Sequence, residues 1–382
     1  MLQLYDSRTR QVRAVEPTRR GLLRMYSCGP GTDRRPHAGQ LRAGLLADLI
    51  RRNAEHRHGL TVLTCQNATR AGSGEDAFRA DCAALNFRPA DHSPRAPEWI
   101  GLITDTVAGL IEAGHARSAS DGSVNFDVES FPGFGDLSGT TGNPRDDWEL
   151  WAGTPGDDGE PAWPAPWGTG RPGRSAECSA LSRHYLGDVI DVHTGGIGLR
   201  FPHHEQERAV SNSVTGHEVV RHWVHGEHTR FDGQPMAGAV TDPGGPVLLV
   251  TDLADRGLDP LALRLAFLGQ GYRQPADLTW DTLEAADGTL RRWRELVAEW
   301  ACSPSKPIHA PAAGQIAAAF DDDLDTPAAL RSLHQLEQDP EVAPGAKFES
   351  FAHADQLLGL DLARDIGRAP ARPTAQRNDS RA

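Results

Sequence analysis

Residues 21–28 (GLLRMYSC) and 60–65 (LTVLTC) are two short apolar runs on either side of a longer amphipathic stretch. Their length and their content of leucine, valine and threonine are typical of buried strands. Between them, residues 41–57 repeat leucine and isoleucine at helical spacing. A strand–helix–strand order is the start of a parallel α/β sheet, which binds ligands at the carboxyl ends of its strands. The sequence therefore predicts an α/β fold in which Cys28 lies at the end of the first of these strands.

A second informative segment, Gly170 to Glu207, contains GRPGRSAECSAL and FPHHEQE. It supplies a thiol at Cys178 and, if FPHHEQE opens a helix, places His203 and Glu207 four residues apart on one face. Thiolate, imidazole and carboxylate are ligand types that zinc accepts. Together with Cys28, these side chains predict a tetrahedral zinc site. The alternative is two buried cysteines beside an ordinary polar helix start, because the spacing is not that of a zinc finger.

The composition describes a large acidic chain. A length of 382 residues can bury a large core and suggests two or three domains. Five cysteines are a sparse and odd set, which favours free or metal-bound thiols over a disulfide framework. The chain has neither a bilayer-length apolar run nor a charged-then-apolar leader, which predicts a soluble cytoplasmic protein without a membrane partner. The net charge of −13 argues against tRNA or DNA as a partner, since proteins that bind them usually present basic surfaces.

The remaining pattern gives the order of the segments along the chain. Residues 129–175 are rich in glycine, proline, aspartate and tryptophan and are expected to be irregular. Strands resume at Val189–His193 and Arg221–His225. From Asp259 onward the periodicity is helical and predicts an α-helical region. Residues after about Leu362 are polar and rich in arginine and proline, which is typical of a disordered tail.

A candidate phosphate site follows the first predicted strand. His37 and Gly39 stand at the start of the predicted helix, in PHAGQL. Exposed N–H groups and the helix dipole favour an anion at such a position, and glycine permits its close approach. His-x-Gly is common by chance, so this pattern alone is a weak signal.

Several motifs taken together resemble one known family. In chain order they are MYSCGP, PHAGQ, LIEAGHARSASDGSVNFDV, GEPAWPAPWGTGRPGRSAECSA, DVHTGG, FPHHEQE, LDPLALRLAFL and FDDDLDTPAALRSL. They resemble the cysteinyl-tRNA synthetases of class I and the related ligase that joins cysteine to glucosaminyl-inositol in mycothiol synthesis. The resemblance implies a Rossmann-like class I catalytic domain with a zinc site and a connective insertion, followed by an α-helical stem or bundle. The limits are residues 1–245 for the catalytic domain, about 70–175 for the insertion, 246–362 for the helices and 363–382 for the tail.

The resemblance also implies roles for single residues. The family's zinc, which binds the substrate thiol directly, is held by residues that match Cys28, Cys178, His203 and Glu207. Such a metal would select cysteine over serine without editing. Positions in the amino-acid pocket match Gly29, Thr69 and His193. The nucleotide signature matches His37, Gly39 and Gln40, of which His37 and Gln40 take the catalytic positions.

The nucleotide machinery departs from the family pattern. Gln40 stands where the signature has a second histidine, and residues 235–239 (PMAGA) replace the Lys-Met-Ser-Lys-Ser loop. The chain has no lysine before Lys306. Adenylation develops negative charge that positioned cations must meet, so the use of ATP is doubtful. Arg174 stands where the family has a tryptophan that closes the cysteine pocket, and it indicates either a substrate with an added carboxylate or phosphate, or a surface cation.

Three functions fit these observations. The first is a specialised ligase that activates cysteine or a similar amino acid and passes it to a small-molecule amine. Recognisable sequence stops before an anticodon-binding domain would begin, which argues against tRNA as the acceptor. The second is an ATP-independent transferase or hydrolase that acts on an aminoacyl or thiol substrate. The third is a non-catalytic protein that binds an amino acid through zinc.

Overall fold

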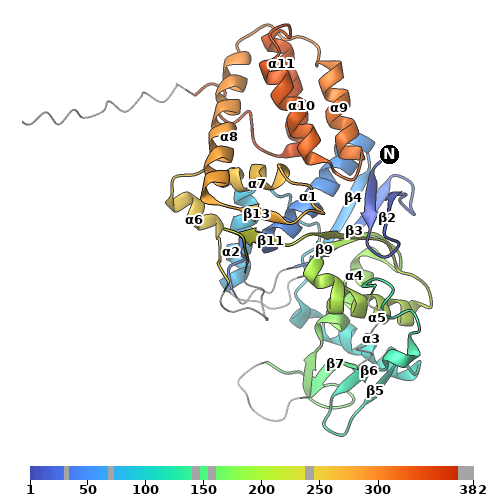
Figure 1. The fold of residues 1–382 in the computed structure, drawn as a ribbon. Coiled ribbons are helices and arrows are strands. Elements are labelled where there is room, and N and C mark those ends of the chain that lie inside the picture. The colour runs from blue at the N-terminus through green and yellow to red at the C-terminus, as the bar shows by residue number, and fades with distance from the viewer. Residues whose placement is uncertain (30–33, 68–72, 140–146, 154–160, 237–244, 369–382) are drawn as a thin grey trace, which may run out of the picture.

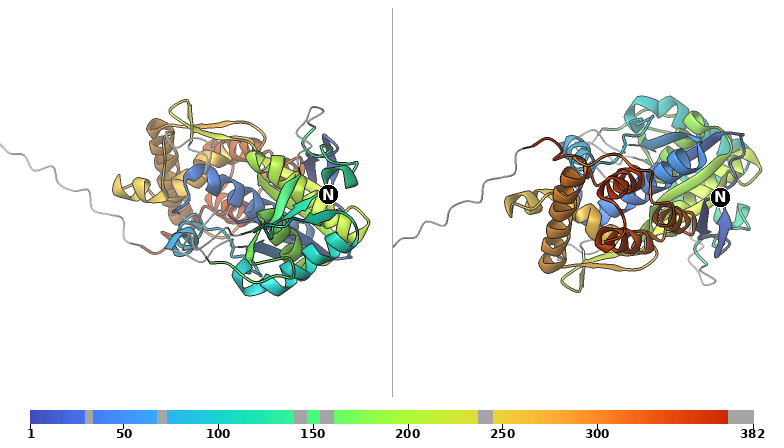
Figure 2. Two further views of the ribbon diagram at one scale, coloured as in Figure 1. Left: turned by 90° about the horizontal axis from the view of Figure 1, so that it is seen from below. Right: turned by 90° about the horizontal axis from the view of Figure 1, so that it is seen from above.

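The computed structural model describes residues 1–29, 34–67, 73–139, 147–153, 161–236 and 245–368. A parallel sheet occupies the middle of the molecule, with C-terminal helices at one end and a small antiparallel sheet at the other (Figure 1). Seen from below, the small sheet lies in front, and seen from above the C-terminal helices do (Figure 2). None of the helices within the described ranges has the length and apolar character that crossing a bilayer requires.

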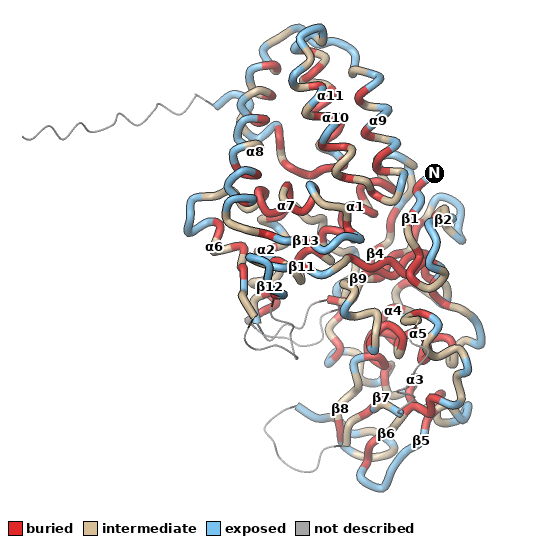
Figure 3. The backbone as a smooth tube through the Cα atoms, in the orientation of Figure 1, coloured by how far each residue is buried: buried red, intermediate tan, exposed pale blue. Residues whose placement is uncertain are grey.

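The parallel sheet positions the candidate site. Its strands are β3 (Leu22–Cys28), β4 (Thr61–Asn67), β9 (Ile190–Gly196) and β10 (Val220–Gly226), in the order β10-β9-β3-β4. All neighbours run parallel, and most of their residues are buried (Figure 3), as expected for a sheet covered on both faces. The register pairs Cys28 with Asn67, and Tyr26 with His193. The predicted α/β fold is confirmed, and residues far apart in the sequence meet at one edge of the sheet.

Helix α1 (Ala38–His58) has sequence signals at both ends. At its start the His37 ring accepts a hydrogen bond from the Gly39 N–H (3.1 Å), and Gln40 Oε1 accepts one from the His37 N–H (3.1 Å). At its end Gly59 takes a φ of 62°, which glycine adopts without the steric cost of a side chain. The predicted apolar side packs into the core, and Leu41, Leu45 and Leu49 are each at most 4% exposed. Burying each such leucine stabilises the fold by about 1.5–3 kcal/mol.

The C-terminal helices follow the sequence prediction closely. The helices from α7 onward confirm the helical periodicity that was predicted from Asp259, whereas α6 lies before that residue and was not predicted as a separate helix. The helices are α6 (Val250–Asp255), α7 (Leu261–Leu268), α8 (Trp280–Trp300), α9 (Ala310–Asp321), α10 (Thr326–Gln338) and α11 (Pro344–Leu358). Their apolar sides share one hydrophobic core with α1 and with the strands β3 and β4. The helical region is therefore packed onto the parallel sheet through α1.

The tail predicted to be disordered is only partly described. Residues 363–368 form turns, and Arg364 makes an ion pair with Asp259 (2.5 Å). Residues 369–382 lie outside the described residues. The domain limits given above stay predictions.

The small sheet corrects one expectation. Its strands are β5 (Ala116–Ser118), β6 (Val124–Phe126), β7 (Trp148–Gly153) and β8 (Gly170–Pro172), all antiparallel. The prediction that residues 129–175 are irregular was wrong for β7 and β8. The segment does not show the alternating apolar pattern of a strand, because close packing requires glycine at positions such as Gly170. A Cβ on Gly170 would lie 2.2 Å from the Ala152 carbonyl oxygen and 2.3 Å from the indole nitrogen of the buried Trp151.

The remaining strands and helices lie around these two sheets. A hairpin of β1 (Gln3–Asp6) and β2 (Gln11–Ala14) lies next to β10, and β11 (Thr229–Phe231) pairs with β12 (Gln234–Pro235) and β13 (Ala276–Leu278). The apolar spacing of residues 98–113 predicts an amphipathic helix, which appears as α3 (Ile100–Glu112), whereas α2 (Ser73–Ala84) and α4 (Arg174–Leu186) were not predicted. A short helical segment at Arg200–His204 leads into α5 (Glu205–Thr215).

Candidate functional site

Four elements bring the predicted metal ligands together. Cys28 is the last residue of β3, and Cys178 lies in α4. His203 is the last residue but one of the short segment before α5, and Glu207 lies in the first turn of that helix. Residues 175–182 of α4 are all buried, polar and apolar alike. This helix therefore lacks an amphipathic pattern, which explains why the sequence did not predict it.

The four predicted ligands form one compact cluster. One donor atom from each of Cys28, Cys178, His203 and Glu207 lies within 4.8 Å of the others. The Nε2 atom of His203 is 3.5 Å from the Cys28 sulfur, 3.6 Å from the Cys178 sulfur and 2.7 Å from Glu207 Oε1. The expected i,i+4 relation of His203 and Glu207 is present. The donor set of two thiols, one imidazole and one carboxylate matches the chemistry of a zinc site.

The proton affinities in the cluster are strongly perturbed. Burial raises the pKa of the Cys28 thiol well above its ordinary value. Burial acts in the same direction on Cys178, but the hydrogen bond with Cys28 and the neighbouring His203 lower its pKa well below the ordinary value. For His203, burial lowers the pKa, yet Glu207 and Cys178 raise it to about 9. The raised pKa values keep protons on Cys28 and His203 in the metal-free cluster, and these are protons that a bound metal ion would displace, since its ligands must be deprotonated.

Buried histidines surround this cluster. His193 Nε2 lies 3.6 Å from the Cys28 sulfur, and burial lowers the His193 pKa to about 3, so the ring is neutral. The ring stacks on Trp223. His204 Nδ1 lies 2.8 Å from His225 Nε2, and donor atoms of Cys28, His193, His204 and Glu207 form a second possible ligand set. The sequence analysis named His204 only as part of FPHHEQE and missed His225, because nothing in their spacing indicates that they meet.

Asn67 is the other residue that the sequence analysis missed. Its side-chain amide donates to the Cys178 sulfur (3.3 Å), and its oxygen accepts from the Gly29 N–H (3.4 Å). A Cβ on Gly29 would lie 2.0 Å from the Asn67 carbonyl oxygen, so this position requires glycine. The sequence could have indicated Asn67, because it follows the second predicted strand and the carboxyl ends of adjacent parallel strands lie side by side.

The residues predicted to bind a nucleotide have a structural role at the start of α1, and their role toward a nucleotide stays a prediction. His37 and Gln40 form the capping box of α1, while Gly39 supplies one of the N–H groups that they satisfy. Thr69 and residues 237–239 lie outside the described residues. Arg174 lies four residues before Cys178 in α4, and its Nη2 donates to the Gly29 carbonyl oxygen (3.1 Å).

Solved structures of similar fold define the class of protein. A Mycobacterium tuberculosis methionyl-tRNA synthetase bound by methionyl-adenylate matches with a TM-score of 0.58 and 13% identity, over 90% of this chain and 90% of that one. A structure described as a putative arginyl-tRNA synthetase from Campylobacter jejuni matches with a TM-score of 0.55 and 11% identity, over 91% of this chain and 92% of that one. The chain has the fold of a class I aminoacyl-tRNA synthetase.

Sequence comparison identifies the family within this class. Residues 71–288 match the family described as the catalytic domain of tRNA synthetases of class I (C). The cysteine–tRNA ligase of Opitutus terrae is 36% identical over 98% of this chain and 88% of its own length. That of Paracoccus denitrificans is 33% identical over 100% of this chain and 90% of its own length. The chain belongs to the cysteinyl-tRNA synthetase family, as the motifs predicted.

Proposed function

We propose that this protein binds cysteine or a closely related thiol through a zinc ion and transfers the aminoacyl group to a small-molecule amine. The observation that carries the proposal is the cluster of Cys28, Cys178, His203 and Glu207, whose donor atoms lie within 4.8 Å of one another. The relatives named cysteine–tRNA ligases support cysteine as the amino acid. A cytoplasmic location is expected for such an enzyme.

The donor set supports zinc as the cofactor. Two thiolates favour a borderline-soft ion over magnesium or calcium, and imidazole and carboxylate complete a tetrahedral shell. Zinc bound there would supply a Lewis acid that prefers a thiolate to a hydroxyl group, which separates cysteine from serine. The neutral His193, stacked on Trp223 beside Cys28, would shape the pocket for the amino acid.

The net charge supports a small amine over tRNA as the acceptor. The chain has a net charge of −13, whereas proteins that bind nucleic acids usually present basic surfaces. The missing lysines of the family's mobile loop concern ATP and do not distinguish the two acceptors; they count against ATP-driven activation itself. Because the relatives are named for tRNA, any test of the acceptor includes tRNA alongside small amines.

ATP–pyrophosphate exchange with zinc-loaded protein tests the first step. We expect cysteine to support exchange, but at least about 100-fold more slowly than with the Opitutus terrae ligase. The reason is that removing one donor to a developing negative charge costs about 10²–10³ in kcat, and several are missing here. Exchange with no amino acid at all would contradict the activation step. Exchange followed by transfer to tRNA but to no amine would contradict the proposed acceptor.

A second candidate function dispenses with ATP. In it, the protein acts as a transferase or hydrolase on a preformed aminoacyl or thiol substrate. The lack of any lysine before Lys306 favours this candidate. A thermal-shift series of thiols, with and without ATP, separates the two functions. A shift that requires ATP counts against the ATP-independent function.

Replacing Asn67 by alanine tests the support of the metal ligands. The variant removes the N–H···S hydrogen bond to Cys178, and we expect zinc to bind about 10–100-fold more weakly, as is typical for groups that orient a metal ligand. Competition with a chromophoric chelator measures the change. The matched control is Gln66→Ala in the same strand, where the side chain donates to Ser27 instead of the cluster. Equal zinc affinity of the two variants would contradict a supporting role for Asn67.

A further inference from the structure

Arg174 places a cation next to the cluster of Cys28, Cys178, His203 and Glu207. Arg174 and Cys178 are four residues apart on α4, so their side chains leave the same side of the helix. The Nη2 atom of Arg174 donates to the carbonyl oxygen of Gly29, the residue that follows Cys28. The guanidinium therefore lies between two segments that each carry a predicted thiol ligand.

The guanidinium has unused binding capacity. An arginine side chain offers five N–H donors, and the contact with Gly29 uses one of them. Across the described ranges, no carboxylate lies within ion-pair distance of Arg174, although many other arginines of the chain have such partners. Its side chain is also exposed to solvent, so a ligand can reach the remaining donors.

The surroundings explain why a positive charge is stable here. Burial by neighbouring atoms acts to lower the pKa of Arg174, but Cys178, Cys28 and Glu207 raise it. The guanidinium thus remains charged and lies within the field of the thiol cluster. A fixed planar fork of donors is suited to a carboxylate or another group with paired anionic oxygens.

We propose that Arg174 forms an anion subsite beside the thiol-binding cluster, and that the natural ligand is a thiol acid. The thiol of this ligand occupies the metal site, and a carboxylate bonds to the Arg174 guanidinium. The carboxylate is either that of a cysteine-type amino acid or an additional one on a larger thiol. This inference rests on the proposed metal site for its thiol contact.

Calorimetric titration of the zinc-loaded protein under anaerobic conditions tests the subsite. The probes are cysteine, cysteamine, 3-mercaptopropionate and mercaptosuccinate. We expect cysteine to bind about 10–100-fold more tightly than cysteamine if Arg174 takes the amino-acid carboxylate, which is the range expected for a charge-assisted pair of hydrogen bonds. If Arg174 takes an additional carboxylate, mercaptosuccinate exceeds 3-mercaptopropionate by the same factor.

Variants assign the effect to this side chain. Arg174→Gln is expected to abolish the preference for the carboxylate while zinc content and cysteamine affinity stay unchanged, and Arg174→Lys to restore only part of it. The matched control is Arg183→Gln on the same helix, where the guanidinium pairs with Asp188. Its preference should equal that of the wild type.

Three different results would each overturn the inference, and each would identify a different part of it as wrong. Equal binding of thiols with and without carboxylates would leave the metal site intact and remove the anion subsite. Loss of zinc from Arg174→Gln would show that the arginine balances the charge of the cluster instead. Binding of no thiol by the zinc-loaded wild type would overturn the proposed function itself, and the inference with it.

Discussion

Cys178→Ala protein is expected to bind zinc at least about 100-fold more weakly than the wild type. Structural zinc sites release about 10–16 kcal/mol on binding their metal, shared among four ligands, so the loss of one thiolate removes a large part of that energy. Cys178 is fully buried and lies 3.6 Å from His203 Nε2. Elemental analysis of the purified protein and competition with a chelator measure the change. Cobalt substitution adds a direct readout, because the intensity of sulfur-to-cobalt absorption follows the number of thiolates bound.

The matched control for this prediction is Cys65→Ala. Cys65 is 1% exposed in β4 and belongs to the same small hydrophobic cluster as Cys178, but it is in neither candidate ligand set. Both variants remove one buried sulfur, so they carry a similar cost in packing. Wild-type zinc affinity in Cys178→Ala would contradict the assignment. It would direct attention to the second set, in which His204 takes part, and the double variant Cys178→Ala/His204→Ala would then lose the metal.

The sequence predicted the site better than it predicted the elements that carry it. Residue types, a strand that ends at Cys28 and the spacing of His203 and Glu207 suggested the group, with two buried cysteines as the alternative, and the family resemblance then supplied the ligand set. The structure brings these four side chains together. The helix that carries Cys178 was not predicted, because its residues 175–182 are all buried, polar and apolar alike, and show no amphipathic periodicity. The strands β7 and β8 were missed because glycines such as Gly153 and Gly170 are required there by close packing, and a glycine contributes nothing to an alternating apolar pattern.

Contacts that depend on how separate elements pack were not predicted. Asn67 reaches Cys178 because β4 and α4, about a hundred residues apart in the sequence, lie side by side. His204 and His225 are only 21 residues apart in the sequence, but their contact also depends on how the segment before α5 packs against β10. Local propensity contains no information about which ends of distant elements meet, since tertiary packing decides it. The helical region was easier, because its amphipathic repeats fix each helix from local sequence alone.

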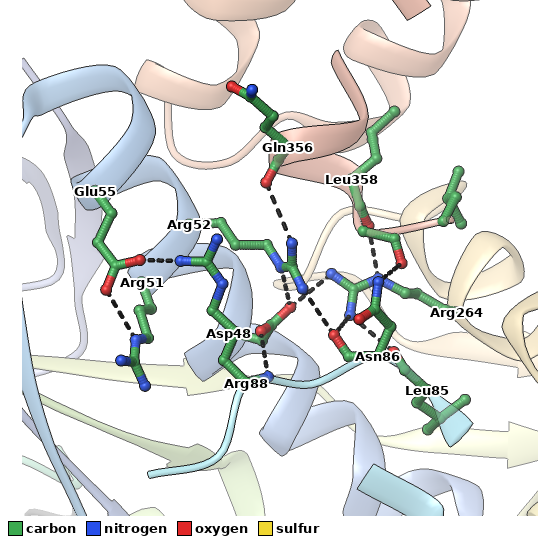
Figure 4. Close-up of polar contacts among 12 residues, drawn as sticks. Asp48, Arg51, Arg52, Glu55, Leu85, Asn86, Arg88, Arg264, Gln356 and Leu358 are labelled. Carbon is green, nitrogen blue, oxygen red and sulfur yellow. Dashed lines mark hydrogen bonds and ion pairs between the residues drawn. The ribbon is translucent and has the colours of Figure 1, made fainter. Parts of the chain in front are cut away.

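A buried ionic network joins α1 to the C-terminal helices (Figure 4). Asp48 Oδ2 accepts from Arg52 Nε (2.7 Å) and Arg264 Nη2 (2.6 Å), and the three side chains are 2%, 7% and 0% exposed, respectively. The two arginines also donate to backbone carbonyls of Gln356 and Leu358 at the end of α11. Among the described residues, Asp48 is the only carboxylate that forms an ion pair with both of these buried guanidinium groups, while Asp355 acts on both charges from farther away.

Asp48→Asn is expected to lower the free energy of unfolding by about 3–5 kcal/mol, because it removes the only ion-pair partner that the two buried guanidinium groups share. Burial acts to raise the Asp48 pKa, but Arg264 and Arg52 lower it below the ordinary value. A carboxyl group with a lowered pKa stabilises the fold above its unfolded pKa, and this contribution is lost as the pH falls through the folded one. The difference between wild type and variant should therefore be constant from neutral pH to about 5 and shrink below about 4. Urea unfolding over this pH range measures it, and hydrogen exchange at the end of α11 should quicken in the variant.

Glu55→Gln is the matched control for this prediction, since Glu55 lies on the same helix and also contacts two arginines, Arg51 and Arg88 (Figure 4). Its side chain is 22% exposed, and those of its partners are 16% and 29% exposed. Water screens these charges in the native state and solvates them when the partner is removed, so the expected loss is at most about 1 kcal/mol. Equal losses in the two variants would mean that burial does not set the strength of the Asp48 network. In that case the link between α1 and α11 would depend on apolar packing and on the carbonyl contacts of Arg52 and Arg264, which Asp48→Asn leaves in place.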